Sequence, residues 1–175
     1  MADYTVNGLN AAAKSLIDVV APSIDPTDPL AKEQLKLVVD YLHFLRDRVD
    51  FIQLRQRFHC QHQHRMAEEL IGHADQVSTV LAGELKLAIS LSTQLLDDPS
   101  ASAVSLRELT AILANRVSRL VNEAVKQNSP AATDIREIVL RRSKDVIDFE
   151  RTWYLPFGFD SKPDSLQTLE SYFGK

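Results

Sequence analysis

Between Pro29 and Pro99 the chain contains no proline, and this stretch opens with apolar residues spaced alternately three and four positions apart. Such spacing puts the side chains on one face of an α-helix and is typical of a coiled coil or a helical bundle. The sequence Asp28-Pro29 indicates the start of the helix. A carboxylate at this position caps free backbone amides, and proline fits the first helical turn. We therefore predict one unusually long helix. Its apolar positions are Leu35, Val38, Leu42, Leu45, Val49 and Ile52.

The C-terminal limit of the long helix depends on Gly72. Glycine readily adopts the left-handed conformation that ends a helix, so we expect the helix to stop at Ile71. A break within Gln61–His64 and an unbroken helix are the alternatives. A helix from Pro29 to Ile71 would be about 65 Å long, whereas neighbours of ~22–24 residues reach roughly 35 Å. Part of its apolar face would then lack cover within one chain, so we predict a homodimer in which a second copy covers it.

Helix signals also dominate the rest of the chain, whereas strand signals such as Asn-Gly turns are missing. Ser105 and Glu108 predict a capping box, in which each side chain caps a free amide at a helix start. The further predicted helices cover 9–21, 75–96, 105–127, a stretch from Ser129 or Thr133 to Pro156, and 165–173. We therefore predict an all-α, antiparallel four- to five-helix bundle with a short C-terminal helix. It forms a single helical-bundle domain over 1–175, with a proline-rich linker at 22–28.

The composition is that of a globular protein and excludes several other classes. Hydrophobic residues make up 45% of the chain and charged residues 25%, and the formal net charge is −4. This charge gives no general attraction to nucleic acid or to an anionic membrane, so we expect neither as a partner. The glycines are too far apart for a G-x-G-x-x-G turn or a Walker A loop, which excludes the common phosphate-binding loops. No apolar run is long enough to span a membrane and no secretory signal is recognisable, so we expect a cytoplasmic location.

The second half of the long helix carries a polar island on its apolar face. In register with the apolar positions, the sequence places Gln56, His59 and Gln63 there. An unsatisfied polar group in a core costs about 1–3 kcal/mol, so these side chains are solvated, hydrogen-bonded or functional. The ligand-binding candidates are the polar island and its neighbours: Gln56, Arg57, His59, His62 and Gln63.

The same stretch contains histidines and the only cysteine in a pattern that fits a metal site. His59 and His62 are three positions apart and Cys60 and His64 are four apart, so each pair shares a helix face and could bind zinc, iron or copper. A carboxylate from another helix would complete the site, and the sequence does not select one. The carboxylates available are Glu84, Glu108, Glu123 and Glu137. Glu-x-x-His and His-Glu-x-x-His are absent, so the cofactor stays unknown beyond a transition metal.

Catalysis has weaker support in the sequence, and no catalytic residue is assigned. Cys60 has His64 one helical turn away, which favours a reactive thiolate, but the amides of a mid-helix residue cannot form an oxyanion hole. Residues 51–67 contain arginines and histidines without an acidic residue, which favours an anion site or a solvated basic stripe. Arg57 and His62 resemble the Arg-x4-His motif of HEPN-type ribonuclease bundles. This resemblance covers six residues and implies that the pair acts on an RNA backbone.

Half of the aromatic residues lie near the end of the chain, from Trp153 to Phe173. Pro156 and Gly158 prevent a continuous helix there. We predict that 155–175 is an aromatic segment that packs on the bundle. The alternative is that it binds a protein partner, because Trp and Tyr are favoured anchors at interfaces.

These features favour a non-enzymatic, cytoplasmic helical-bundle protein that acts through self-assembly or partner binding. The alternative is a bundle that binds a small ligand or a metal at a polar His/Gln/Arg site on the long helix, with a HEPN-like ribonuclease as a remote case. A polar island that faces an enclosed cavity would favour the alternative, and one that faces open water would favour the first class.

Overall fold

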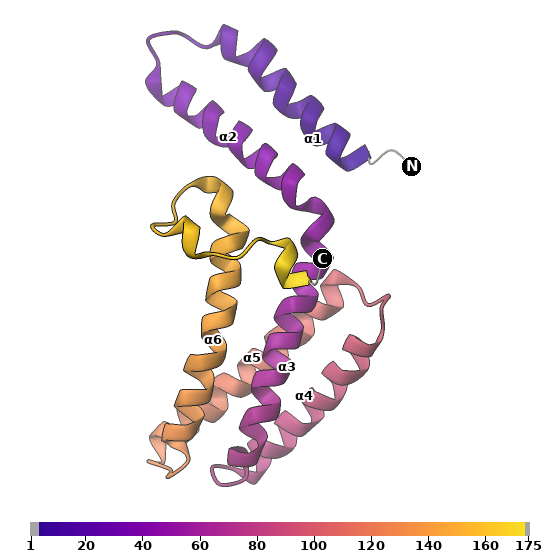
Figure 1. Ribbon diagram of the computed structural model, residues 1–175, viewed down its shortest axis with the longest axis vertical. Coiled ribbons are helices and arrows are strands. Elements are labelled where there is room, and N and C mark those ends of the chain that lie inside the picture. Colours follow the sequence, from indigo (N-terminus) through magenta and orange to yellow (C-terminus); the bar gives the residue numbers. More distant parts are fainter. Residues whose placement is uncertain (1–3, 174–175) are drawn as a thin grey trace. The chain divides into compact units, whose positions relative to one another are not determined.

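The computed structural model describes residues 4–173, in which helices, turns and loops occur without a β-strand (Figure 1). This part of the chain divides into two compact units. Unit 1 consists of residues 4–52 and 154–159, and unit 2 consists of residues 53–153 and 160–173. The predicted all-α helical bundle is confirmed, and none of the described helices is long and apolar enough to cross a membrane. That the whole chain forms a single domain stays a prediction.

The α-helices account for most of the described residues. In chain order they are α1 (Tyr4–Ser15), α2 (Pro29–Arg48), α3 (Ile52–Ala74), α4 (Thr79–Asp97), α5 (Ala103–Lys126) and α6 (Ala132–Tyr154). The shorter π-helical or 3-10 turns are η1 (Leu16–Val20), η2 (Ala21–Ser23), η3 (Val49–Phe51), η4 (Leu155–Phe157), η5 (Pro163–Ser165) and η6 (Glu170–Phe173). Within unit 1, α1 and α2 lie side by side (Figure 1). Asp28 caps α2 as predicted, because its Oδ1 accepts a hydrogen bond from the backbone N–H of Ala31 at 2.9 Å.

The predicted long helix is interrupted near its middle. α2 ends at Arg48, η3 follows, and α3 then continues past Gly72 to Ala74. The alternative break at Gln61–His64 is not present, since these residues lie inside α3. α2 has 20 residues and α3 has 23, while α4, α5 and α6 have 19, 24 and 23. A homodimer therefore no longer follows from the length of one helix.

The core of unit 2 is formed by α3, α4, α5 and α6. On α5 every position of the predicted apolar face is buried: Leu106, Leu109, Leu113, Val117, Leu120 and Ala124. Leu70 of α3, Leu85 of α4 and Ile135 of α6 are fully buried in the same core. Since α3 contacts both α4 and α6 through its side chains, its polar residues meet partners on either side.

The start of α5 differs from the prediction. α5 begins at Ala103, and its N-cap is Ser102, whose Oγ accepts a hydrogen bond from the backbone N–H of Ser105 at 3.0 Å. The capping box predicted at Ser105 and Glu108 was therefore wrong, because both residues already lie inside the helix.

The aromatic segment after α6 is divided between the two units. In unit 1, Phe157 packs on Phe44 of α2, with ring centroids 4.6 Å apart. In unit 2, Tyr172 packs on Phe149 of α6, with ring centroids 5.1 Å apart. The short C-terminal helix expected over 165–173 is not continuous in the structure: this range contains only the last residue of the 3-10 turn η5 and the 3-10 turn η6. The last residues of the segment lie outside the described part of the chain.

Candidate functional sites

The polar island of α3 and its neighbours face several different partners. His59 Nε2 lies 2.6 Å from Glu150 Oε1 of α6, and His64 Nδ1 lies 2.7 Å from Ser92 Oγ of α4. Cys60 is fully buried. Across the described residues, no group of three or more His, Cys, Asp or Glu side chains is placed to hold a metal ion. The structure does not bring together the predicted metal ligands His59, Cys60, His62 and His64.

His59 belongs to a network that links α3 to α6. Arg55 donates to both carboxylate oxygens of Glu150, with Nε 3.1 Å from Oε1 and Nη2 2.7 Å from Oε2. The Arg55 guanidinium also lies over the Trp153 ring, 4.7 Å from its centroid. Burial raises the pKa of Glu150, but the hydrogen bonds from His59 and Arg55 outweigh it, so the pKa lies below its ordinary value. Because both oxygens of Glu150 are engaged, this network stabilises the packing of α3 on α6.

Arg57 binds the C-terminal end of α4. Its Nη1 donates to the Leu96 carbonyl and its Nη2 to the Asp98 carbonyl, each at 2.7 Å. The last carbonyls of a helix have no partner inside the helix and carry partial negative charge, which a guanidinium satisfies. His62 instead lies toward Asp145 of α6, with Nε2 3.7 Å from Oδ2. The arginine and the histidine of the Arg-x4-His motif therefore face different helices.

The remaining candidates lie at least half-buried in unit 2. Gln56 and Gln63 are half-buried, and Gln63 Oε1 has no hydrogen-bond partner in the described part of the chain. Burial raises the pKa of the Cys60 thiol, and a hydrogen bond with Thr110 of α5 offsets only part of this. A protonated, buried thiol is a poor nucleophile, so Cys60 serves packing.

A small pocket lies beside His62 in unit 2 and has a volume of about 330 Å³. It is lined by Phe58, His62, Lys144, Asp145, Asp148, Gln167 and Tyr172, and we call it the His62 pocket. His62 is buried and stacks on Phe58, with ring centroids 4.2 Å apart. Burial lowers the pKa of His62, which keeps the imidazole neutral near pH 7. One of the ligand-binding residues predicted from the sequence thus lines a cavity.

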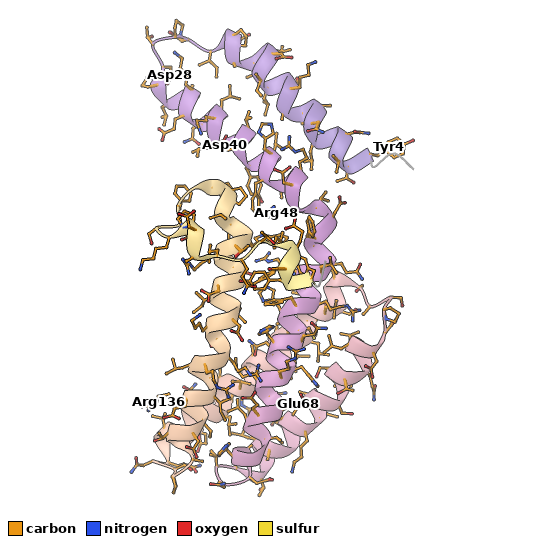
Figure 2. All side chains as sticks on the ribbon, in the orientation of Figure 1. Tyr4, Asp28, Asp40, Arg48, Glu68 and Arg136 are labelled. Atoms are coloured by element: carbon orange, nitrogen blue, oxygen red, sulfur yellow. The ribbon has the colours of Figure 1, made fainter. Side chains whose placement is uncertain are left out.

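A larger groove lies along α2 in unit 1 and was not predicted from the sequence. Its volume is about 720 Å³. Its aromatic part is formed by Phe44, Phe157 and Phe159, and its acidic part by Glu33, Asp40 and Asp47. Figure 2 marks Asp40 on α2. We call this surface the aromatic–acidic groove.

Compared with known proteins, the chain matches no protein-family model, no curated protein and no solved structure.

Proposed function

We propose that this chain is a non-enzymatic helical protein that binds a protein partner through the aromatic–acidic groove of unit 1. The observation that carries this proposal is the Phe159 ring, which lines the groove and is 87% exposed. Phe157 contacts both Phe44 and Phe159, with ring centroids 4.6 Å and 6.3 Å away. Exposed aromatic rings next to a recess are typical anchors of protein interfaces.

The acidic part of the groove favours one kind of partner. Glu33, Asp40 and Asp47 recur at every seventh position of α2, so neighbouring carboxylates lie about 10.5 Å apart along the helix. Lys36 pairs with Asp40 and Arg46 pairs with Asp47, whereas Glu33 has no ion-pair partner in residues 4–173. Negative charge beside exposed rings complements an amphipathic helix that carries basic and apolar side chains. We therefore propose a basic amphipathic segment of another protein as the occupant.

Synthetic amphipathic helices test this proposal. A peptide of leucine and lysine at helical spacing represents the partner, and the same peptide with glutamate in place of lysine is the charge-reversed control. Calorimetric titration of the full chain should detect binding of the lysine peptide only. The affinity should fall as salt is added, because exposed charge pairs are screened.

Phe159→Ala and Glu33→Lys separate the aromatic and acidic contributions. Each should weaken binding of the lysine peptide by about fivefold or more, and Glu33→Lys should strengthen binding of the glutamate peptide. The matched controls lie in unit 2: Leu140→Ala on α6, where the side chain is also exposed, and Glu108→Lys on α5. Equal binding of the two peptides, or equal losses in all four variants, would contradict the proposal.

A further inference from the structure

The His62 pocket of unit 2 presents neighbouring hydrogen-bond acceptors. His62 Nδ1 lies 3.3 Å from the backbone carbonyl oxygen of Phe58. A carbonyl oxygen only accepts hydrogen bonds, so Nδ1 carries the ring proton and Nε2 of the neutral imidazole keeps a lone pair. Nε2 lies 3.7 Å from Asp145 Oδ2, which is too far for a hydrogen bond between the two groups.

The separation of these acceptors suits a donor placed between them. A nitrogen atom about 2.8–3.0 Å from each acceptor fits between atoms that are 3.7 Å apart. The nitrogen must carry several N–H groups to donate in both directions. An ammonium group meets this requirement, and its charge is balanced by the Asp145 carboxylate.

The other charged groups at the pocket direct their hydrogen bonds to residues other than Asp145. Lys144 Nζ donates to Asp148 Oδ2 at 2.7 Å, and Asp148 also accepts a hydrogen bond from Arg151, so the hydrogen bond of this lysine goes to Asp148 while its charge still acts on Asp145. The Asp145 side chain is 55% exposed, and no residue in the described part of the chain donates a hydrogen bond to it. Arg142, which acts electrostatically on His62, is paired with Glu69 of α3.

We propose that the His62 pocket binds the primary ammonium group of a small organic amine. The nitrogen donates to His62 Nε2 and to the Asp145 carboxylate, and the carbon chain lies against the Phe58 and Tyr172 rings that line the pocket. A volume of about 330 Å³ is at the lower end for ligand pockets, which limits the amine to a few heavy atoms.

Other ligand classes fit this pocket less well. An anion would meet the Asp145 carboxylate and the His62 lone pair, which both repel it. A zinc ion would find His62 and Asp145 as ligands, fewer than the three protein ligands of a catalytic zinc site. Lys144, which lines the pocket, and the exposed Arg65 both oppose a cation electrostatically, so we expect weak binding, with a dissociation constant for an amine of about 1 mM.

The test follows the histidine side chains of the full chain by NMR while butylammonium is added at about pH 7.5. The His62 signal should shift saturably. Tetramethylammonium has the same charge without an N–H group and should bind more weakly, and butyrate should not bind. A failure here leaves partner binding by the groove untouched, because the groove belongs to unit 1.

Asp134 provides a matched control for Asp145. Asp134 Oδ2 lies 3.8 Å from His73 Nδ1, so this pair also joins α6 to α3, but neither residue lines the His62 pocket. Asp145→Asn should weaken butylammonium binding by about tenfold or more, and Asp134→Asn should leave it unchanged. Both carboxylates are more than half exposed, so both variants should fold. The proposal is overturned by unchanged affinity in Asp145→Asn, by an equal response to butyrate, or by the lack of a saturable His62 shift.

Discussion

Arg57 donates to backbone carbonyls at the end of α4, so the fold orients its guanidinium before any ligand is present. Backbone carbonyls move only if the helix end moves. An arginine held in this way stabilises the helix end and the contact between α3 and α4. The role that the Arg-x4-His resemblance implies would require these hydrogen bonds to be given up.

Replacing Arg57 by alanine should lower the free energy of unfolding by about 1.5–3 kcal/mol, because hydrogen bonds from a charged donor are lost. Urea unfolding followed by circular dichroism measures the change. The control is Arg65→Ala on the same helix, since Arg65 is exposed and donates to no residue that the structure describes. Its effect should stay within about 0.5 kcal/mol. Equal effects of the two substitutions would leave Arg57 without a stabilising role at the helix end.

His62 should make the protein less stable in mild acid. Burial lowers its pKa below the ordinary 6.5, so the unfolded chain binds this proton more readily than the folded chain. The contribution of His62 to the free energy of unfolding should therefore fall as the pH drops through 6.5 and level off below the folded-state pKa. NMR titration of the histidine side chains checks this directly. A His62 signal that titrates at or above pH 6.5 would contradict the expectation.

The location of the polar island could be predicted from the sequence, but its partners could not. Gln56, His59 and Gln63 continue the spacing of the apolar face, and all three are at least half-buried. His59 meets Glu150, which lies 91 positions away in the sequence. The period of one helix carries no information about which residues of a distant helix lie opposite. The His62 pocket depends on such distant residues and was not predictable either.

The start of α2 and the apolar face of α5 were predictable at the level of single elements, whereas the start of α5 and the interruption between α2 and α3 were not. Asp28 and the apolar face of α5 follow local rules of capping and periodicity. η3 at Val49–Phe51 contains neither glycine nor proline, and the apolar spacing passes through it without a change. The seven-residue repeat of acidic side chains on α2 was present in the sequence. The sequence alone does not show that Phe157 and Phe159 lie beside this repeat and form a groove with it.

Ser102 and Ser105, near the start of α5, should contribute differently to the free energy of unfolding. Ser102→Ala should lower the free energy of unfolding by about 0.5–2 kcal/mol, because the Ser102 hydroxyl accepts a hydrogen bond from the first turn. Ser105→Ala keeps the backbone N–H that donates this bond, so its effect should be smaller. Thermal or urea unfolding of both variants measures the difference. A larger effect of Ser105→Ala would restore the capping box predicted from the sequence.

On the scale of the whole molecule, the apolar surface of unit 1 favours self-association. Outside the aromatic–acidic groove, its exposed large hydrophobic side chains include Tyr4, Ile17, Val19, Leu30, Val38 and Tyr41. Exposed apolar surface drives association when a second surface covers it. We expect a homodimer, with twice the chain mass by sedimentation or light scattering over a range of concentrations. A monodisperse monomer at all concentrations would count directly against it.

The Cys60 thiol can serve as a built-in probe of how often the helices around it open. It is the single thiol of the chain, and it lies fully buried in unit 2. A thiol reagent can reach it only when the surrounding helices separate, so the labelling rate in native buffer reports how often unit 2 opens. Thiol labelling does not report on the opening of unit 1 alone, because that unit contains no cysteine. A substitution on α2 that accelerates labelling of Cys60 would therefore reveal that the two units open as one cooperative body, and an unchanged rate would reveal independent motion.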